Sequence, residues 1–438
     1  MVPMRKLQEL CSGWTLLALL SLSLVLAPRS LYAQQDEIPL VSGAPSTEGT
    51  RVVAHRPRLY SVKKVAHPVF WFEGAISPVL RIAERFGGNV SKKEEEKTPP
   101  ESGIKFGAGG LGGSTGFGPM IKPFHHNLFN AGIRAEASAL ITYKWYQAAG
   151  ARVDFPLISG PDQGVEVGIL ADYVSRPSDF FYGIGNETAA TNGSRFRTVS
   201  RTAGAGLNLR FNKSWLARLE SGFRSIGVTE PREPKPMALV FQGQDIPGQM
   251  TGATMNVSTA LLQRNTKDHP SWAQSGGLQR FEATLAEGLR GGDFSYWRYR
   301  LNLQQFLPLS EDHREVIALR AAVETNQDKG GSRVPFFDMA TIGGSSTLRG
   351  YMTNRFTDKS SLTLSAEYRY RIWRYFDLGF FTDAGQVAPE VGDFAMDNFH
   401  MGYGVRFFAR SAKRRGVIVD LAHSREAWVV YLDFSPLF

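Results

Sequence analysis

Two glycine-rich segments near residue 110 match motifs that bind phosphate or activate a nucleophile. Gly107–Gly112 fits the G-x-G-x-x-G pattern of dinucleotide-binding loops, but no helix follows to present its N-terminus to a pyrophosphate. Residues 112–116 fit the G-x-S-x-G pattern of a nucleophile elbow, but Pro119 stands where the next helix should begin. The sequence therefore favours a glycine-rich strand and loop here, and neither nucleotide binding nor acyl transfer.

Residue types that ligate metals or transfer protons also lack the required spacing. His125 and His126 are adjacent, so on a strand their side chains point to opposite faces and cannot chelate one ion. The sequence has no H-E-x-x-H segment, and Cys11 is its one cysteine, which excludes paired-cysteine zinc sites and disulfides within the chain. No pair of carboxylates stands in a context typical of hydrolases. We therefore expect a protein that is not an enzyme and that has no metal and no cofactor.

Composition favours strands and turns over packed helices, because the chain of 438 residues has 45 glycines and 12% aromatic residues. Its formal net charge of +9 suits either a solvated surface or attraction to anionic lipid or nucleic acid. No basic run is interleaved with aromatic residues, so nucleic acid is not expected as a partner. A solvated surface and attraction to anionic lipid both stay open as explanations of the positive charge.

Charged and apolar side chains alternate along the chain after residue 101. Within residues 362–372, the even-numbered positions are apolar or aromatic, and the odd-numbered positions are polar. On a strand the two sets lie on opposite faces. Glu367, Arg369 and Arg371 then follow one another on one face, which a dry core accepts only with full pairing but a water-filled lumen accepts readily. Residues 297–304 and 317–324 alternate in the same way. The pattern predicts an all-β, transmembrane antiparallel β-barrel; a soluble β-sandwich is the alternative.

The length of this region predicts about sixteen strands, because a strand with its connection takes roughly twenty residues. Short connections such as 212–214 and 310–312 are expected on the periplasmic side. Longer ones near 182–195, 229–250 and 327–360 are expected to face outward. At the end of the chain, one face of the expected closing strand carries Trp428, Phe434 and the terminal Phe438, and outer-membrane barrels commonly end on such a strand.

Residues 1–33 have the features of an export signal, with Arg5 and Lys6 before an apolar stretch, Thr15–Ala27, that is too short to span a bilayer. Residues 34–100 are expected to form a periplasmic linker that includes an amphipathic segment at 61–88. No later stretch has roughly eighteen consecutive apolar residues. We therefore assign 101–438 to the barrel and expect it in the bacterial outer membrane.

Several short motifs of the barrel region resemble those of the BamA/TamA outer-membrane insertion-porin (bacterial surface antigen) superfamily. Ile342–Tyr351 is similar to the loop of that family that enters the barrel, with Arg349, Gly350 and Tyr351 at its tip. Residues 381–385 match its F-x-D-x-G strand motif, which here is formed by Phe381, Asp383 and Gly385. Glu367 occupies the family's acidic position, and residues 181–186 resemble a second recurrent loop.

Strand alternation points Glu367 and Asp383 toward the lumen. A long loop that folds back inside the barrel can bring Arg349 to these carboxylates, and guanidinium–carboxylate pairing there would be bidentate. Gly343, Gly344 and Gly350 permit the tight backbone path of such a loop. In the alternative interpretation, Arg349 is a solvated loop residue and Asp383 an ordinary charge at a strand end.

The resemblance implies that the protein assists insertion, assembly or translocation of proteins or lipids at the outer membrane. Client outer-membrane proteins, assembly factors and outer-membrane lipids are the implied partners. Members that insert other barrels usually carry POTRA modules, but residues 34–100 are too short, proline-rich and charged for one, which indicates a barrel-only member. Two alternatives stay open: a passive porin-like channel in which inward arginines such as Arg298, Arg300 and Arg320 favour anions, and a lipid-handling or adhesion protein that acts through its long loops.

Overall fold

The computed structural model describes residues 101–433, apart from 112–114, 161, 232–234, 250, 271, 290–293, 374 and 411–415. The expected signal peptide and linker at 1–33 and 34–100 lie outside these residues, as do Phe434 and Phe438. Within the described part of the chain, no helix is long and apolar enough to cross a membrane.

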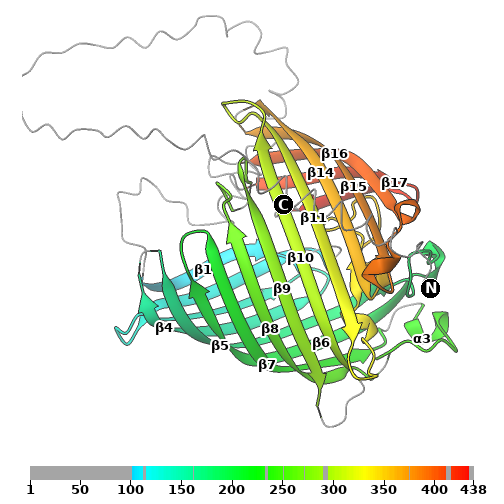
Figure 1. Ribbon diagram of the computed structural model, residues 1–438, viewed down its shortest axis with the longest axis horizontal. Coiled ribbons are helices and arrows are strands. Elements are labelled where there is room, and N and C mark those ends of the chain that lie inside the picture. Colours follow the sequence, from blue (N-terminus) through cyan, green and yellow to red (C-terminus); the bar gives the residue numbers. More distant parts are fainter. Residues whose placement is uncertain are drawn as a thin grey trace, which may run out of the picture. The chain divides into compact units, whose positions relative to one another are not determined.

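Sixteen strands form one antiparallel sheet in chain order, and β12 and β13 form a separate hairpin (Figure 1). The all-β class and the predicted strand number are therefore confirmed. The strands are β1 Ser102–Gly109, β2 Gly118–Leu128, β3 Ile133–Ile141, β4 Gln147–Ser159, β5 Gly164–Phe181, β6 Ser194–Arg210, β7 Trp215–Thr229, β8 Ala253–Asn265, β9 Gly276–Gly288, β10 Ser295–Pro308, β11 Glu315–Asp328, β12 Ala340–Ile342, β13 Phe356–Asp358, β14 Ser360–Trp373, β15 Phe376–Ala388, β16 His400–Arg410, β17 Gly416–Ser424 and β18 Trp428–Asp433. The helical segments are η4 Ala190–Asn192, α3 Met237–Val240, η5 Phe336–Asp338, η6 Val391–Asp393 and η7 Met396–Asn398.

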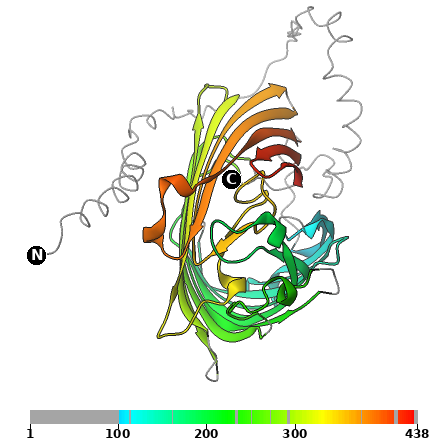
Figure 2. The ribbon, with the colours of Figure 1, turned by 90° about the vertical axis from the view of Figure 1, so that its right-hand side faces the viewer.

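The two ends of the sheet are free edges in the described residues. There β1 pairs only with β2, and β18 pairs only with β17. The strands nevertheless curve strongly around an interior that holds the connection between β11 and β14 (Figure 2).

The apolar face of each strand points outward. On β14, Leu364, Tyr368 and Tyr370 are 36–39% exposed, and Phe380 on the neighbouring β15 is 52% exposed. A soluble protein does not leave such a continuous apolar surface in water, whereas lipid accommodates it. The opposite face of β14 carries the polar residues of the alternation, and Glu367 and Arg369 are buried there.

The connections differ in length at the two ends of the strands. The long ones, between β5 and β6, β7 and β8, and β11 and β14, all lie at one end, as the sequence predicted, whereas turns such as 211–214 and 309–314 lie at the other. At the long-loop end the loops share an apolar core, in which Phe336 of η5 contacts the rings of Phe181 and Phe196 at centroid distances of 5.2 and 4.9 Å. This core holds the β11–β14 connection in a fixed position inside the sheet.

Candidate functional site

The β11–β14 connection presents its tip to the inner wall of the sheet. The β12–β13 hairpin forms its stem, with Ile342 paired to Phe356. In the tip, Gly344 donates its N–H to the Tyr351 carbonyl oxygen at 3.1 Å. Gly343, Gly344 and Gly350 have φ values of 121°, 89° and 93°, a region in which a side chain is strained. The glycines therefore fold the tip tightly enough to enter the barrel.

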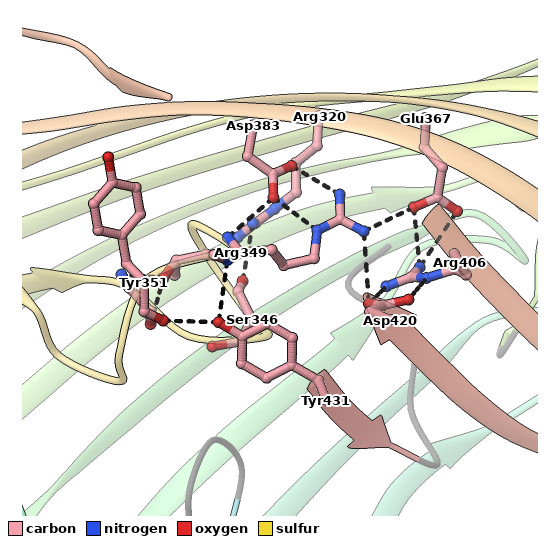
Figure 3. A network of polar contacts seen from close by, with 12 residues as sticks. Arg320, Ser346, Arg349, Tyr351, Glu367, Asp383, Arg406, Asp420 and Tyr431 are labelled. Carbon is pink, nitrogen blue, oxygen red and sulfur yellow. Dashed lines mark hydrogen bonds and ion pairs between the residues drawn. The ribbon is translucent and has the colours of Figure 1, made fainter. Parts of the chain in front are cut away.

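Arg349 at this tip binds two carboxylates of the wall (Figure 3). Its Nε and Nη2 donate to the two oxygens of Asp383 on β15 at 2.7 and 2.8 Å, and its backbone N–H donates to Asp383 Oδ2 at 3.1 Å. Its Nη1 donates to Glu367 Oε2 on β14 at 3.1 Å. The guanidinium also lies 3.4 Å above the centre of the Phe381 ring, where cation–π attraction adds to the ion pairs.

The carboxylates continue the network across β16 and β17. Glu367 also pairs with Arg369 at 2.7 Å and with Arg406 at 3.0 Å. Arg406 in turn forms a fork-to-fork pair with Asp420 at 2.7 and 2.6 Å. These three arginines and three carboxylates have side chains no more than 4% exposed. Their formal charges balance, so none of the buried charges is left without a counter-charge.

The ionisation of the loop residues follows from these contacts. Burial by itself lowers the pKa of Arg349, but Asp383, Glu367 and Asp420 outweigh it and raise that pKa above its usual value. Burial by itself raises the pKa of Asp338 in η5, but Arg224 and Arg298 hold it below its usual value. Arg224 Nη1 lies 2.9 Å from Asp338 Oδ1. Both loop residues are therefore charged at neutral pH, and each forms ion pairs with the wall.

The tip is also tied to the last two strands. Gly350 donates its N–H to Tyr431 Oη on β18 at 3.2 Å, and its carbonyl oxygen accepts a hydrogen bond from Ser424 Oγ on β17 at 2.7 Å. Tyr431 Oη donates to the Tyr351 carbonyl oxygen at 2.7 Å (Figure 3). A Cβ atom on Gly402 of β16 would lie 1.9 Å from the Arg349 carbonyl oxygen. The loop tip thus contacts all five strands from β14 to β18.

The structure brings together the residues that the sequence assigned to the loop tip and to the F-x-D-x-G motif, and Gly385 lies beside the loop stem. A Cβ on Gly385 would lie 3.0 Å from Ile342 Cδ1 of the hairpin, so the wall glycine permits close packing of the loop stem. The expected closing-strand residue Trp428 lies away from this cluster, 65% exposed and 4.4 Å from the His423 ring.

The connection between β8 and β9, at the short-turn end of the strands, also contacts the network, and no sequence pattern indicated this contact. Trp272, in the β8–β9 connection, is buried with its ring 3.9 Å from the Arg369 guanidinium and 4.1 Å from the Phe408 ring. Ala273 accepts a hydrogen bond from Arg369 Nη1 at 3.1 Å. Arg406 and Asp420 were also missed as site residues, because only the β16–β17 register shows that they are direct neighbours.

A second set of contacts joins the β5–β6 loop to β15, to the β15–β16 connection and to the β11–β14 loop. Asn186, from the segment that resembled a recurrent family loop, accepts the Val387 N–H at 3.0 Å and donates to the Asn398 carbonyl oxygen at 2.8 Å. Arg355 in the β11–β14 loop forms an ion pair with Glu426 at 2.9 Å and donates to Thr188 Oγ1 at 2.9 Å. The two long loops therefore hold each other in place.

The inner face of β3–β7 is lined differently. A cavity of about 340 Å³ there is bordered by Arg134, Arg152, Arg210, Arg218 and the carboxylates Asp154 and Glu166. Arg152 pairs with Asp154 at 2.8 Å, and Glu166 pairs with Arg134 and Arg210. These side chains are 13–43% exposed, which leaves them accessible to water.

Comparison with known proteins agrees with this architecture. Residues 156–412 match the Omp85 superfamily domain. The chain is a member of the Omp85 superfamily. A similar structure is BamA from Haemophilus ducreyi lacking POTRA domains 1-3, at 14% identity and a TM-score of 0.57 over 82% of this chain and 76% of that one. At this identity, the likeness establishes the Omp85 barrel fold alone.

Two further Omp85 structures are similar over less of their length. CdiB from Acinetobacter baumannii has 10% identity and a TM-score of 0.44, over 75% of this chain and 58% of that chain. CdiB from Escherichia coli has 12% identity and a TM-score of 0.46, over 77% of this chain and 62% of that chain.

Proposed function

We propose that this Omp85 protein resides in the bacterial outer membrane and assists the insertion, assembly or translocation of other proteins there, without enzymatic chemistry. The observation that carries the proposal is the tie between the loop tip and the last strands: Gly350 and Tyr351 bind Tyr431 of β18. The Arg349 network anchors the same tip to β14 and β15. The loop therefore fixes the position of the β18 edge.

A fixed strand edge can act on a client protein in a specific way. In the described residues, β18 has no neighbour beyond β17, and β1 has none beyond β2. Backbone groups on such edges can pair with an incoming strand, and the main-chain hydrogen bonds do not require a particular client sequence. Outer-membrane proteins of many sequences would then be suitable clients, with lipids and other assembly factors as further partners.

Reconstitution of the full chain in liposomes tests the proposal. We expect it to accelerate folding of a second outer-membrane barrel relative to empty liposomes, and Asp383→Asn to lose most of this acceleration, because Arg349 loses its bidentate partner. Glu166→Gln, on the inner face of β5, is the matched control and should accelerate folding as the wild type does. Equal rates in protein-containing and empty liposomes would contradict the proposal.

The alternative of a porin-like channel has one favourable observation, the basic cavity along β3–β7. Against anion selectivity, Arg298 is paired with Asp338 at 3.3 Å, and Arg300 with Glu282 and Glu324 at 3.1 and 2.9 Å. Planar-bilayer recordings of the same preparation separate the two functions. Steady anion-selective conductance without faster client folding would favour the channel.

A further inference from the structure

Most arginines of the described chain bind a carboxylate, a carbonyl or a hydroxyl group, but three do not. Among side chains that the structure describes, Arg197, Arg201 and Arg264 have neither an ion pair nor a hydrogen bond, and all three are exposed. An unpaired guanidinium is unremarkable in water. On the outer surface of a membrane barrel, by contrast, such a guanidinium must lie at a height at which the membrane supplies a partner for its charge.

Strand register places Arg197 and Arg201 on the lipid-facing side of β6. Phe196 packs in the apolar core inside the sheet, and Arg210 borders the inner cavity, so even-numbered positions of β6 face inward. Because side chains alternate on a strand, odd-numbered positions face outward. Arg197 and Arg201 share that outer face with Ala203, Ala205, Leu207 and Leu209.

The height of the two arginines on the barrel follows from the neighbouring strand. Arg201 pairs with Ser225 of β7 and Arg197 with Thr229. Trp215 lies on the same outer face at the short-turn end, 38% exposed. The ten steps from Trp215 to Ser225 rise about 26 Å at roughly 3.4 Å per residue and a tilt of roughly 40°, which is about the height of the apolar band of such barrels. Arg201 therefore lies at the upper border of that band, and Arg197 lies above it.

The chemistry at this border is suited to phosphate. Phosphate oxygens accept the parallel N–H groups of a guanidinium. The register partners Ser225 and Thr229 carry uncharged hydroxyl groups, so they do not compete with phosphate as ion-pair partners of the arginines. Asp179 of β5, which pairs with Phe196 in the register, forms an ion pair with Arg176, and Glu230, which follows Thr229, accepts the Ala238 N–H. Among the described residues, Arg197 and Arg201 thus keep two positive charges without an ion-pair partner, one at the upper border of the apolar band and one above it.

We infer that Arg197 and Arg201 form a binding site for a phosphate-bearing lipid of the leaflet on the long-loop side of the barrel. This inference rests on the membrane-embedded barrel and is independent of the client-folding activity proposed above. Arg264 provides an internal comparison, because it pairs with Trp215 in the register and so lies at the opposite border of the apolar band.

The experiment uses the folded full chain in detergent micelles with a purified diphosphoryl glycolipid, and measures bound lipid by native mass spectrometry. We expect Arg197→Gln/Arg201→Gln to weaken binding about thirtyfold, as two cations near a membrane surface contribute. Arg197→Lys/Arg201→Lys should retain most of the binding, and Arg264→Gln should bind as the wild type does. If the double Gln variant does not fold, each single Gln variant should weaken binding about fivefold.

Three results would overturn the assignment. Wild-type affinity in the Gln variants would remove both arginines from lipid binding. An equal loss in Arg264→Gln would show that any outward positive charge suffices. Displacement of the glycolipid by millimolar inorganic phosphate would show a simple anion site and not a lipid site. Heat-dependent mobility on gels checks that each variant has folded.

Discussion

The inner walls formed by β3–β7 and by β14–β17 carry the same residue types but differ in how far these side chains are exposed. Along β3–β7, arginines and carboxylates pair across the strands and stay 13–43% exposed beside a cavity. Along β14–β17, the charged side chains of the Arg349 network are at most 4% exposed, and Glu367 alone contacts three arginines. The difference comes from the loop that covers the second wall, because strand alternation is the same in both.

This contrast shows that an inward charge has two different energetic roles in one barrel. Exposed pairs exchange their partners with water at little cost. Buried pairs depend on one another, because removing one member leaves another charge without a partner in a dry environment. The loss in the free energy of unfolding should therefore differ by several kcal/mol between substitutions in the two walls.

The largest effect is expected for Arg349→Ala, which removes the cation between Asp383 and Glu367. Loss of one member of a buried network costs about 3–5 kcal/mol, whereas Arg152→Ala on the other wall should cost about 0–1 kcal/mol. Urea unfolding of both variants in the same detergent, followed by tryptophan fluorescence, gives the comparison. Equal midpoints for the two variants would show that loop cover does not separate the walls.

A smaller effect is expected for Gly402→Ala, because the added Cβ meets the Arg349 carbonyl oxygen. Forcing a methyl group into a packed contact costs about 1–3 kcal/mol. Gly227→Ala is the matched control, since the nearest atom to its Cβ would be 4.0 Å away. A change within about 0.5 kcal/mol is expected there, and a Gly402 variant that behaves in the same way would place the loop tip farther from β16 than the structure does.

The smallest effect is expected for Glu166→Gln, which removes the pairs with Arg134 and Arg210. The loss should be about 0–1 kcal/mol and should shrink further at 1 M salt, because solvent ions screen exposed pairs. Thermal unfolding at low and high salt measures it. A large, salt-independent loss would mean that this wall is as dry as the other.

Much of the fold could be predicted from the sequence because its signals are local. The period of two assigns Glu367 and Asp383 to the inner face without any knowledge of their partners, and segment lengths give the strand number. The pairing of Arg406 with Asp420 could not be predicted in the same way, because it depends on the register across a turn. Trp272 lies in a turn without any periodicity, and its partner Arg369 is 97 residues further along the chain.

Part of the candidate site could be predicted because clustered glycines indicate an unusual backbone path, and because a charged side chain restricts the environment in which it can lie. A run with glycines at 343, 344 and 350 around one arginine indicates an unusual backbone path, and the structure gives all three glycines positive φ values. The contact of Asn186 with Val387 joins residues 201 positions apart. Such contacts between loops follow from how the loops pack at the end of the sheet, and no local pattern encodes them.

The loop tip acts as a brace, because it holds β14, β15, β16, β17 and β18 through one short segment. A barrel that is held together along five adjacent strands deforms elsewhere. Any widening or narrowing of this barrel is therefore expected mainly at β1–β4, which form no hydrogen bond or ion pair with this loop among the described residues, whereas β7 and β10 are tied to it through Asp338. Compliance on one side and stiffness on the other give the molecule a preferred direction of deformation, and that direction is set by one short loop tip.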